Sequence, residues 1–332
     1  MATLRYEVET RTFKAPFRIS GFVFHVTDLL VVTLTEGEHR GRGEGAGIYY
    51  LGQGVAQMVA LLEQHREAIE RCESREELRM ILPAGGARNA VDCAMWELEA
   101  SRAGRPAWQL AGLQSVKPLV TTLTIGADEP SKMAEAARGY AHAKAIKIKL
   151  TGDLDLDAAR VAAVRAARED VWIGVDANQG FVIEELDRLV PSMLEQRVEL
   201  IEQPLARGRE GDLDGYVSPI PLAADESALW LPDVASLVGR FQVLNIKLDK
   251  CGGLTEALLM VEEARRLGLG VMVGNMTGTS LAMAPAFIVA QHCDFVDLDG
   301  PIFLAEDRTP SVTYDNGEIW CPDEVWGSGA TA

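Results

Sequence analysis

The chain has 332 residues, of which 48% are hydrophobic and 24% charged, a composition typical of a globular protein with a sizeable core. Its formal net charge of −17 repels polyanions, so we expect neither nucleic acid nor a membrane surface as a partner. The five cysteines are scattered without a CxxC pair, and the polar N-terminus has no signal pattern. No stretch reaches the roughly 18 apolar residues of a membrane span, and we therefore expect a cytoplasmic protein.

Residues 1 to about 115 predict an α+β domain in which strands precede helices. LRYEVETRTF alternates apolar and polar residues and DLLVVTLTEG is a β-branched run, so two strands are expected in the first 35 residues or so. Helical spacing of apolar residues runs from Val55 to Leu82. A second amphipathic helix, NAVDCAMWELEASRAG, is closed by Gly104 and Pro106.

Two stretches of this domain are expected to be irregular, and both carry aromatic residues. KAPFRISGFVFHVT, between the two strands, holds Phe22 and Phe24, while the glycine-rich GRGEGAGIYYLGQG holds Tyr49 and Tyr50. These aromatics either line a pocket or belong to a hairpin that packs its own apolar side chains.

From about residue 116 to 301 the pattern changes to alternating strands and helices. LVTTLTI, AIKIKL, WIGVDA, ELIEQP, IPLAADES, FQVLNIKL, LGVMVGN and CDFVDLDG are strand candidates, and most are separated by helical stretches. Eight such units predict a parallel (β/α)8-type barrel. The tail, residues 302–332, cannot add another unit, and we expect it to pack back on the first domain.

Charged residues stand at or beside the ends of five of these strands, at regular intervals. Lys149 is followed after 27 residues by Asp176, after 26 more by Glu202, after 23 by Asp225 and after 22 by Lys247. Each step is about the length of one βα unit. Because the C-terminal strand ends of a barrel converge on one mouth, these side chains are expected to meet there.

Asp176, Glu202 and Asp225 would supply three oxygen ligands from successive strands. Oxygen ligands with no accompanying Cys or His favour Mg²⁺ over Zn²⁺. The alternative for each residue alone is a solvated loop acid, and the repetition at unit spacing weakens that alternative.

Lys147 and Lys149 lie two apart in a strand, so both side chains leave on one face. Repulsion between two ammonium groups is expected to lower the pKa of at least one, which would allow it to act as a base. Lys247, four strands later, is expected to face Lys149 across the barrel. The alternative is that the lysines only neutralise the acid cluster.

The motifs KIK, VDANQ, IEQP, ADES and NIKLDKCGG resemble those of the enolase superfamily, in its muconate-lactonizing-enzyme-like subgroup. The likeness covers nearly the whole chain, since that family also has an N-terminal α+β capping domain. Its members remove a proton α to a carboxylate with a lysine or histidine base and Mg²⁺. Carried over by motif, the resemblance implies that Asp176, Glu202 and Asp225 are metal ligands. It also implies that Lys149 and Lys247 are the acid/base pair and that Lys147 is their electrostatic helper.

The last strand carries Asp297 and Asp299 on one face, which resembles the DxD motif with which dipeptide epimerases hold the substrate's ammonium group. The alternative is an acidic turn. The resemblance implies an isomerase that inverts the C-terminal residue of an L,L-dipeptide through an enediolate. The aromatic stretch RISGFVFHVTD predicts that the inverted, C-terminal residue of the dipeptide is neutral or hydrophobic. The GNMTGTS stretch lacks the acid that other subgroup members carry after strand seven.

Two further functions stay open from the sequence. One is N-acylamino acid racemisation or a syn-elimination like that of o-succinylbenzoate synthase. Activity on a substrate without a free ammonium group would argue for this alternative. The other is a non-catalytic binding barrel, which predicts lost lysines or acids, and none is missing. We expect a homo-oligomer that acts on a small molecule.

Overall fold

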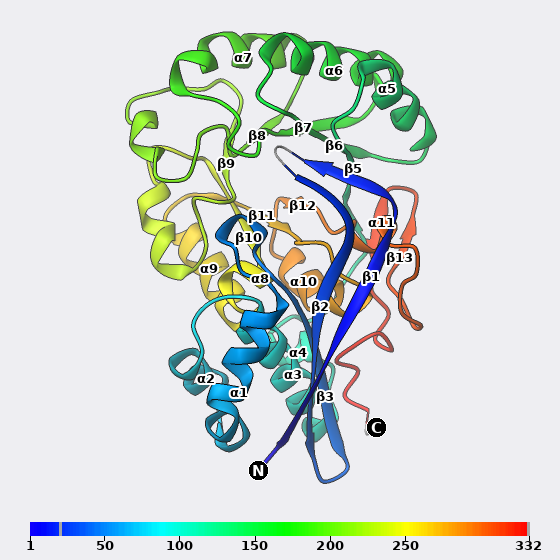
Figure 1. The fold of residues 1–332 in the computed structure, drawn as a ribbon, viewed down its shortest axis with the longest axis vertical. Helices are drawn as coiled ribbons and strands as arrows, with labels where there is room; N and C mark the ends of the chain where they lie inside the picture. The colour runs from blue at the N-terminus through cyan, green and yellow to red at the C-terminus, as the bar shows by residue number, and fades with distance from the viewer. Residues whose placement is uncertain (20–21, 331–332) are drawn as a thin grey trace.

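The computed structural model describes residues 1–19 and 22–330, and it has an N-terminal α+β part beside a barrel (Figure 1). The N-terminal part is a three-stranded antiparallel sheet covered by helices. Its strands, in the order in which they pair, are β1 (Thr3–Ile19), β2 (Phe22–Glu36) and β3 (His39–Ala46). Its helical segments are η1 (Tyr49–Leu51), α1 (Val55–Arg71), α2 (Arg75–Ile81), α3 (Gly86–Ala103) and α4 (Ala107–Leu110).

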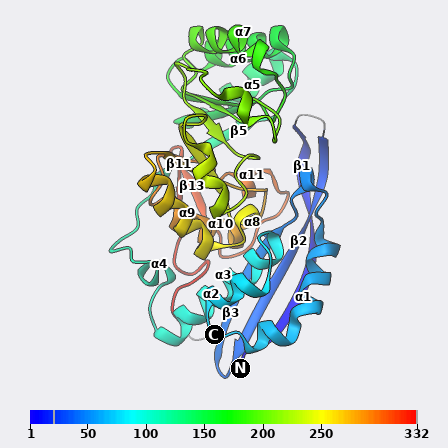
Figure 2. The ribbon, with the colours of Figure 1, turned by 90° about the vertical axis from the view of Figure 1, so that its left-hand side faces the viewer.

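The first stretch expected to be irregular, residues 14–27, is strand wherever the structure describes it, so that prediction is wrong; Ser20 and Gly21 lie outside the described residues. In the second stretch, residues 41–46 are strand, whereas residues 47–54 are irregular, as predicted, apart from the short η1. β1 continues to Ile19 and β2 begins at Phe22, with a shift of register between Thr12 and Phe17. The long hairpin extends from the N-terminal part to the barrel near β5 (Figures 1 and 2). Pairing with a partner strand overrides the loop signals of proline and glycine here.

The glycines of the second stretch alternate along β3 because the helix α3 lies directly against them. A Cβ on Gly41 would lie 2.0 Å from the carbonyl oxygen of Ala94, and one on Gly43 would lie 2.0 Å from that of Ala90. Glycine therefore allows this strand and helix to pack backbone to backbone. The predicted helices are confirmed, except that the run from Val55 to Leu82 is divided into α1 and α2. The residue after α3 is Gly104, in the left-handed region at φ 60°.

The barrel contains eight parallel strands in sequential order, as predicted. They are β5 (Thr122–Ile125), β6 (Ala145–Lys149), β7 (Trp172–Asp176), β8 (Leu200–Glu202), β9 (Leu222–Ala224), β10 (Val243–Lys247), β11 (Gly270–Gly274) and β12 (Phe295–Val296). Side chains join the two edge strands: the Thr122 hydroxyl donates to Asp297 and the Leu298 amide donates to Thr121 Oγ1.

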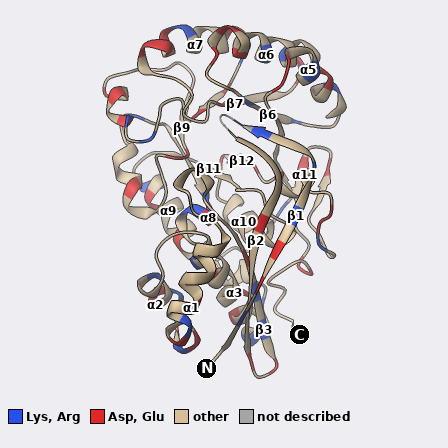
Figure 3. Cartoon of the chain, viewed as in Figure 1, with Lys and Arg blue, Asp and Glu red and all other residues tan. Residues whose placement is uncertain are grey.

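Helices cover the outside of the barrel (Figure 2). Acidic and basic residues are spread along the outer helices α5 to α7 (Figure 3). The helical segments are α5 (Pro130–Gly139), α6 (Leu154–Ala167), α7 (Ile183–Glu195), η2 (Glu210–Leu213), η3 (Leu231–Leu237), α8 (Leu248–Cys251), α9 (Leu254–Arg266), α10 (Ser280–Ala290) and α11 (Gly300–Phe303). Within residues 1–19 and 22–330, none of the helices combines the length and apolar character needed to cross a membrane.

The tail contacts both parts of the molecule. Its hairpin, β13 (Thr313–Asp315) and β14 (Glu318–Trp320), pairs with β4 (Leu119–Val120) at the start of the barrel. Farther along, the Trp326 indole donates to the Arg42 carbonyl of β3 at 2.8 Å. The tail therefore ties the N-terminal sheet to the barrel.

Candidate active site

Three buried carboxylates stand side by side at the C-terminal ends of neighbouring strands. Asp176 ends β7, Glu202 ends β8 and Asp225 follows β9 directly. Asp176 and Glu202 are partners in the parallel register, and all three residues are at most 1% exposed. The barrel geometry thus brings together acids that lie 49 positions apart in the chain.

Lys147 lies among these acids. Its ammonium nitrogen is 2.7 Å from Glu202 Oε2, 3.2 Å from Asp176 Oδ2 and 2.9 Å from Asp297 Oδ2. Burial alone would lower the pKa of Lys147, but the charges of these carboxylates raise it well above its usual value. This direction is opposite to the one expected from repulsion between neighbouring lysines.

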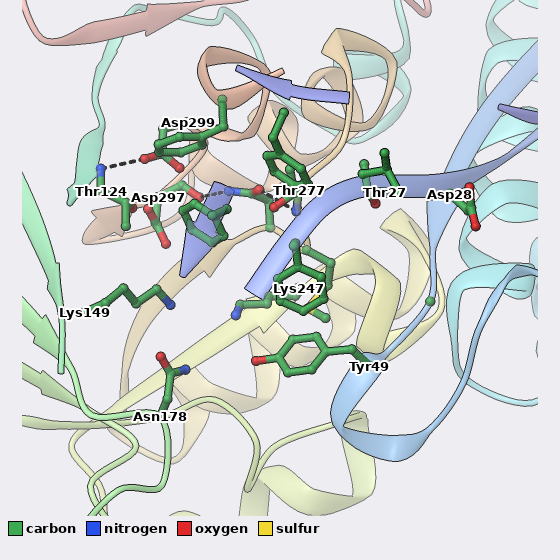
Figure 4. Close-up of a pocket in the computed structure, with 18 of the residues that line it drawn as sticks. Thr27, Asp28, Tyr49, Thr124, Lys149, Asn178, Lys247, Thr277, Asp297 and Asp299 are labelled. Atoms are coloured by element: carbon green, nitrogen blue, oxygen red, sulfur yellow. Dashed lines mark hydrogen bonds between the residues drawn. The ribbon is translucent and has the colours of Figure 1, made fainter. Parts of the chain in front are cut away.

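Lys149 and Lys247 approach from opposite sides of the mouth. Lys149 Nζ lies 2.6 Å from Asp176 Oδ2, and Lys247 Nζ lies 2.7 Å from Asp225 Oδ2. Figure 4 shows their ammonium ends pointing toward each other across the cavity, with Asn178 and the Tyr49 hydroxyl beside them. Burial would lower the pKa of Lys247, but the charges of Asp225 and Glu202 outweigh it and raise the pKa.

Several polar residues of the mouth were not singled out from the sequence. Lys250 donates to Asp225 Oδ1 at 2.6 Å, and the Asn245 amide donates to Glu202 Oε1 at 2.7 Å. Lys250 lies within the NIKLDKCGG motif, three residues after Lys247, so this motif was the available signal. Asn178 donates its backbone N–H to Asp176 Oδ1 at 3.0 Å.

The mouth holds more buried carboxyl groups than ammonium groups. Burial, followed by the charge of Asp176, raises the pKa of Glu202 to about 7, and burial with the charge of Asp225 raises that of Glu226 to about 8. Within the described chain, Glu202 Oε2 and Glu226 Oε2 receive no hydrogen bond of good geometry. The six buried acids exceed the four lysines by two: Asp176, Glu202, Asp225, Glu226, Asp297 and Asp299 against Lys147, Lys149, Lys247 and Lys250.

This excess of negative charge and the all-oxygen donor set fit a divalent hard cation. Among the described residues, no three Asp, Glu, His or Cys side chains are arranged so that they could hold a metal ion as they stand. Lysine ammonium groups contact the carboxylates instead, and they supply part of the positive charge that the acids require.

Asp297 and Asp299 lie at the opposite end of the cavity from Tyr49 (Figure 4). The Thr122 hydroxyl and Lys147 donate to Asp297. Burial alone would raise the pKa of this carboxyl, but the charge of Lys147 and these hydrogen bonds together lower it. Asp299 accepts the Thr124 N–H at 2.7 Å. Burial and the neighbouring charge of Asp297 raise the pKa of Asp299 to about 7. Within residues 1–19 and 22–330, Lys147 pairs with Asp297 and no ion pair to Asp299 is found.

A cavity of about 240 Å³ joins these groups to the N-terminal hairpin. Phe24 and Tyr49 line it, with their ring centroids 5.4 Å apart. Phe22 and Tyr50 do not line it, but their rings pack against Tyr49, at 4.9 Å and 5.2 Å between centroids. Both the pocket and the self-packing interpretations of these aromatics are therefore partly correct.

The loop after β11, whose role the sequence left open, also lines the cavity through Asn275, Met276 and Thr277. Asn275 donates its amide to the Asp297 carbonyl at 2.8 Å. Thr279, at the start of α10, donates its N–H to the buried Glu44 carboxylate of β3 at 2.7 Å. The N-terminal sheet therefore holds this cavity loop in place.

Family models match both parts of the chain. The mandelate racemase / muconate lactonizing enzyme N-terminal domain matches residues 1–112, and the enolase C-terminal domain-like model matches residues 132–331.

Curated relatives cover nearly the full length. An L-Ala-D/L-Glu epimerase of Escherichia coli is 36% identical over 96% of this chain and 99% of its own. A hydrophobic dipeptide epimerase of Roseobacter litoralis is 35% identical over 95% of this chain and 94% of its own.

Solved structures agree with this assignment. An enolase family member from Agrobacterium tumefaciens, with bound sodium and L-Ala-L-Glu, superposes with a TM-score of 0.95 at 39% identity, covering 98% of this chain and 100% of its own. A dipeptide epimerase from Methylococcus capsulatus, complexed with Mg and L-Arg-D-Lys, has a TM-score of 0.89 at 28% identity and covers 95% of each chain. The eight-stranded barrel, its N-terminal cap and these matches together place the chain in the enolase superfamily, with the mandelate racemase and muconate lactonizing enzymes.

Proposed function

We propose that this protein is a Mg²⁺-dependent dipeptide epimerase that inverts the α-carbon of the C-terminal residue of an L,L-dipeptide. The observation that carries this proposal is the opposed pair Lys149 and Lys247, with the acid pair Asp297 and Asp299 in the same cavity. The dipeptide epimerases among the relatives support the substrate class.

Asp176, Glu202 and Asp225 would hold the cation. Their oxygen donors, their positions on adjacent strands and the uncompensated acid charge support this assignment. When bound, Mg²⁺ would act as a Lewis acid that stabilises the negative charge developing on the substrate carboxylate.

Lys149 and Lys247 would act as the two acid/base groups. One lysine removes the α-proton from its own face, and the other delivers a proton to the opposite face, which inverts the stereocentre. Lys147 contacts two of the proposed metal ligands and Asp297, so it would serve as an electrostatic helper. Asn178 lies beside this pair and would contact the substrate near the reacting carbon.

Asp297 and Asp299 would bind the substrate's terminal ammonium group. Asp297 is already paired with Lys147, whereas Asp299 has no ion pair among the described residues, and burial and the charge of Asp297 raise its pKa. An ammonium group would supply that missing charge. An acylated amino acid or an amine-free acid would not, which disfavours N-acylamino acid racemisation and succinylbenzoate-type elimination.

The side chain of the inverted residue would lie against the N-terminal hairpin. Phe24, Val26 and Tyr49 line this side of the cavity, and no arginine is among the described lining residues. A glutamate side chain would face aromatic rings without a cation, which favours neutral or hydrophobic residues.

Screening L,L-dipeptides in deuterated water with Mg²⁺ tests the proposal directly. We expect deuterium at the C-terminal α-carbon together with formation of the L,D product. Exchange confined to N-acylamino acids, or no exchange with any dipeptide, would refute the proposed substrate class. The absence of exchange with any dipeptide would also favour a non-catalytic binding barrel.

We further propose that the protein works as a homo-oligomer in the cytoplasm. The scattered cysteines support a reducing compartment. Sedimentation of the purified chain checks the assembly, and a monomer at working concentration would contradict it.

A further inference from the structure

A second cavity of about 470 Å³ lies next to the active-site cavity. Phe17, Thr124 and Phe303 line both cavities, so these residues separate one from the other. The side chains farther along the second cavity, such as Tyr140 and Met133, do not line the active-site cavity. The active-site cavity therefore shares one wall with a second cavity.

Two of the three residues that line both cavities are aromatic. The centroids of Phe17 and Phe303 are 5.0 Å apart with the ring planes tilted by 51°, and Phe13 stacks on Phe17 at 5.9 Å. Phe17 comes from β1 and Phe303 from α11, so the wall forms only where the N-terminal hairpin meets the barrel.

Backbone and side-chain hydrogen bonds hold the two sides of the wall together. The Ala305 N–H donates to the Thr12 carbonyl at 2.8 Å, and Lys14 Nζ donates to the Ile302 carbonyl at 2.9 Å. Phe13 also forms an isolated β-bridge with Leu304. These contacts fix the backbone segments that carry the two rings.

The wall is adjacent to the acid pair. Asp299 precedes α11 directly, and Phe303 is the last residue of that helix, four positions later. In a dipeptide whose ammonium group is bound by Asp297 and Asp299, the N-terminal α-carbon is one bond from that group. The N-terminal side chain must therefore begin close to these residues, and this step rests on the proposed function.

We propose that Phe17 and Phe303 limit the N-terminal residue of the substrate to small side chains, such as those of glycine, alanine and serine. The second cavity is a latent extension of the same subsite, which the aromatic wall closes. Removing one ring would join the two spaces and admit a long N-terminal side chain.

The test compares kcat/KM for Gly-L-Leu, L-Ala-L-Leu, L-Leu-L-Leu and L-Phe-L-Leu, which keep the inverted residue constant. For the wild type we expect L-Phe-L-Leu to be roughly 10- to 200-fold worse than L-Ala-L-Leu. Phe303→Ala should reduce this ratio by about tenfold or more, mainly through KM of the large substrates.

A graded series separates opening of the wall from general damage. Phe303→Leu should give an intermediate ratio, and Phe303→Trp should raise it above the wild-type value. Phe17→Ala opens the wall from the other element and serves if Phe303→Ala does not fold. Damage unrelated to the wall would lower kcat/KM for all four dipeptides by similar factors.

Wild-type acceptance of L-Phe-L-Leu as readily as L-Ala-L-Leu would overturn the inference. So would an unchanged ratio in a folded Phe303→Ala or Phe17→Ala variant. Failure of the wild type on every dipeptide is a different result, because it overturns the proposed function itself.

Discussion

The barrel mouth and the N-terminal hairpin line the same cavity with mostly opposite kinds of side chain. At the mouth, charged groups such as Asp176 and Glu202 are at most 1% exposed and contact cations. At the hairpin, Phe22 and Val23 are 43% and 50% exposed, and the contacts are between rings. Proton transfer requires fixed, desolvated charges, whereas size selection requires only a shaped apolar surface. The comparison predicts that changes at the mouth affect rate and changes at the hairpin affect substrate choice.

The largest effect is expected when the proposed metal ligands are changed. Glu202→Gln removes one charge from the ligand set at nearly constant shape, so Mg²⁺ should bind more weakly and kcat should fall about 10⁴-fold or more. Calorimetric titration with Mg²⁺ and the epimerisation rate measure the two effects separately. Exhaustive chelation should abolish wild-type activity, and Mg²⁺ should restore it. Full activity after chelation would show that no metal is needed.

Substitution of either lysine should leave proton exchange partly intact, unlike substitution of a metal ligand. Lys149→Ala and Lys247→Ala should each slow inversion by about 10² to 10⁴-fold, because each removes one of two acid/base groups. Each variant should still exchange the α-proton of one epimer with deuterium, since a single base can remove and return a proton on its own face. NMR of the L,L and L,D peptides in deuterated water distinguishes these outcomes. Normal epimerisation by either variant would exclude the two-base scheme.

A buried polar contact joins the hairpin sheet to the mouth, and it provides a way to perturb both regions together. Glu44 accepts from Arg308 Nη2 at 3.0 Å, and the same nitrogen lies 2.9 Å from Glu9 Oε2. Glu44→Gln weakens the anchor of Thr279, from which the cavity loop Asn275–Thr277 extends back to β11.

We expect Glu44→Gln to lower the free energy of unfolding by about 1–3 kcal/mol and kcat/KM by up to about 10²-fold. Thermal melts and steady-state kinetics check both values. Glu9→Gln is the matched control, because Glu9 is partly exposed and contacts the same guanidinium without touching the loop. Equal effects from the two variants would argue against a specific role for Glu44.

The sequence predicts the mouth better than the hairpin for a physical reason. Asp176, Glu202 and Lys247 end apolar strands at unit spacing, so a periodic pattern alone indicates where they lie. The glycines of β3 are typical of a loop in the sequence alone. Only the close packing of α3 explains why a strand should lack side chains at these positions.

Tertiary contacts explain the remaining differences. The pKa of Lys147 rises because three carboxylates from other strands surround it, and neighbours in its own strand do not reveal this. The aromatic wall is formed by Phe17 and Phe303, which are 286 positions apart in the chain, so no local sequence pattern predicts it.

The smallest effect is expected when the residue to be inverted is changed, because in the proposed binding mode its side chain would face the exposed rim of the cavity. Phe24 and Tyr49 offer apolar contact there, and partial exposure of the neighbouring Phe22 reduces what either substrate gains on burial. We expect kcat/KM for L-Ala-L-Leu to exceed that for L-Ala-L-Glu by about tenfold. Phe24→Arg supplies the missing cation and should reverse the order, whereas Phe24→Leu keeps the apolar contact and should preserve it. A clear wild-type preference for L-Ala-L-Glu would refute the predicted selectivity and would mean that the polar groups of this rim, among them Tyr49 and Thr27, outweigh its aromatic surface.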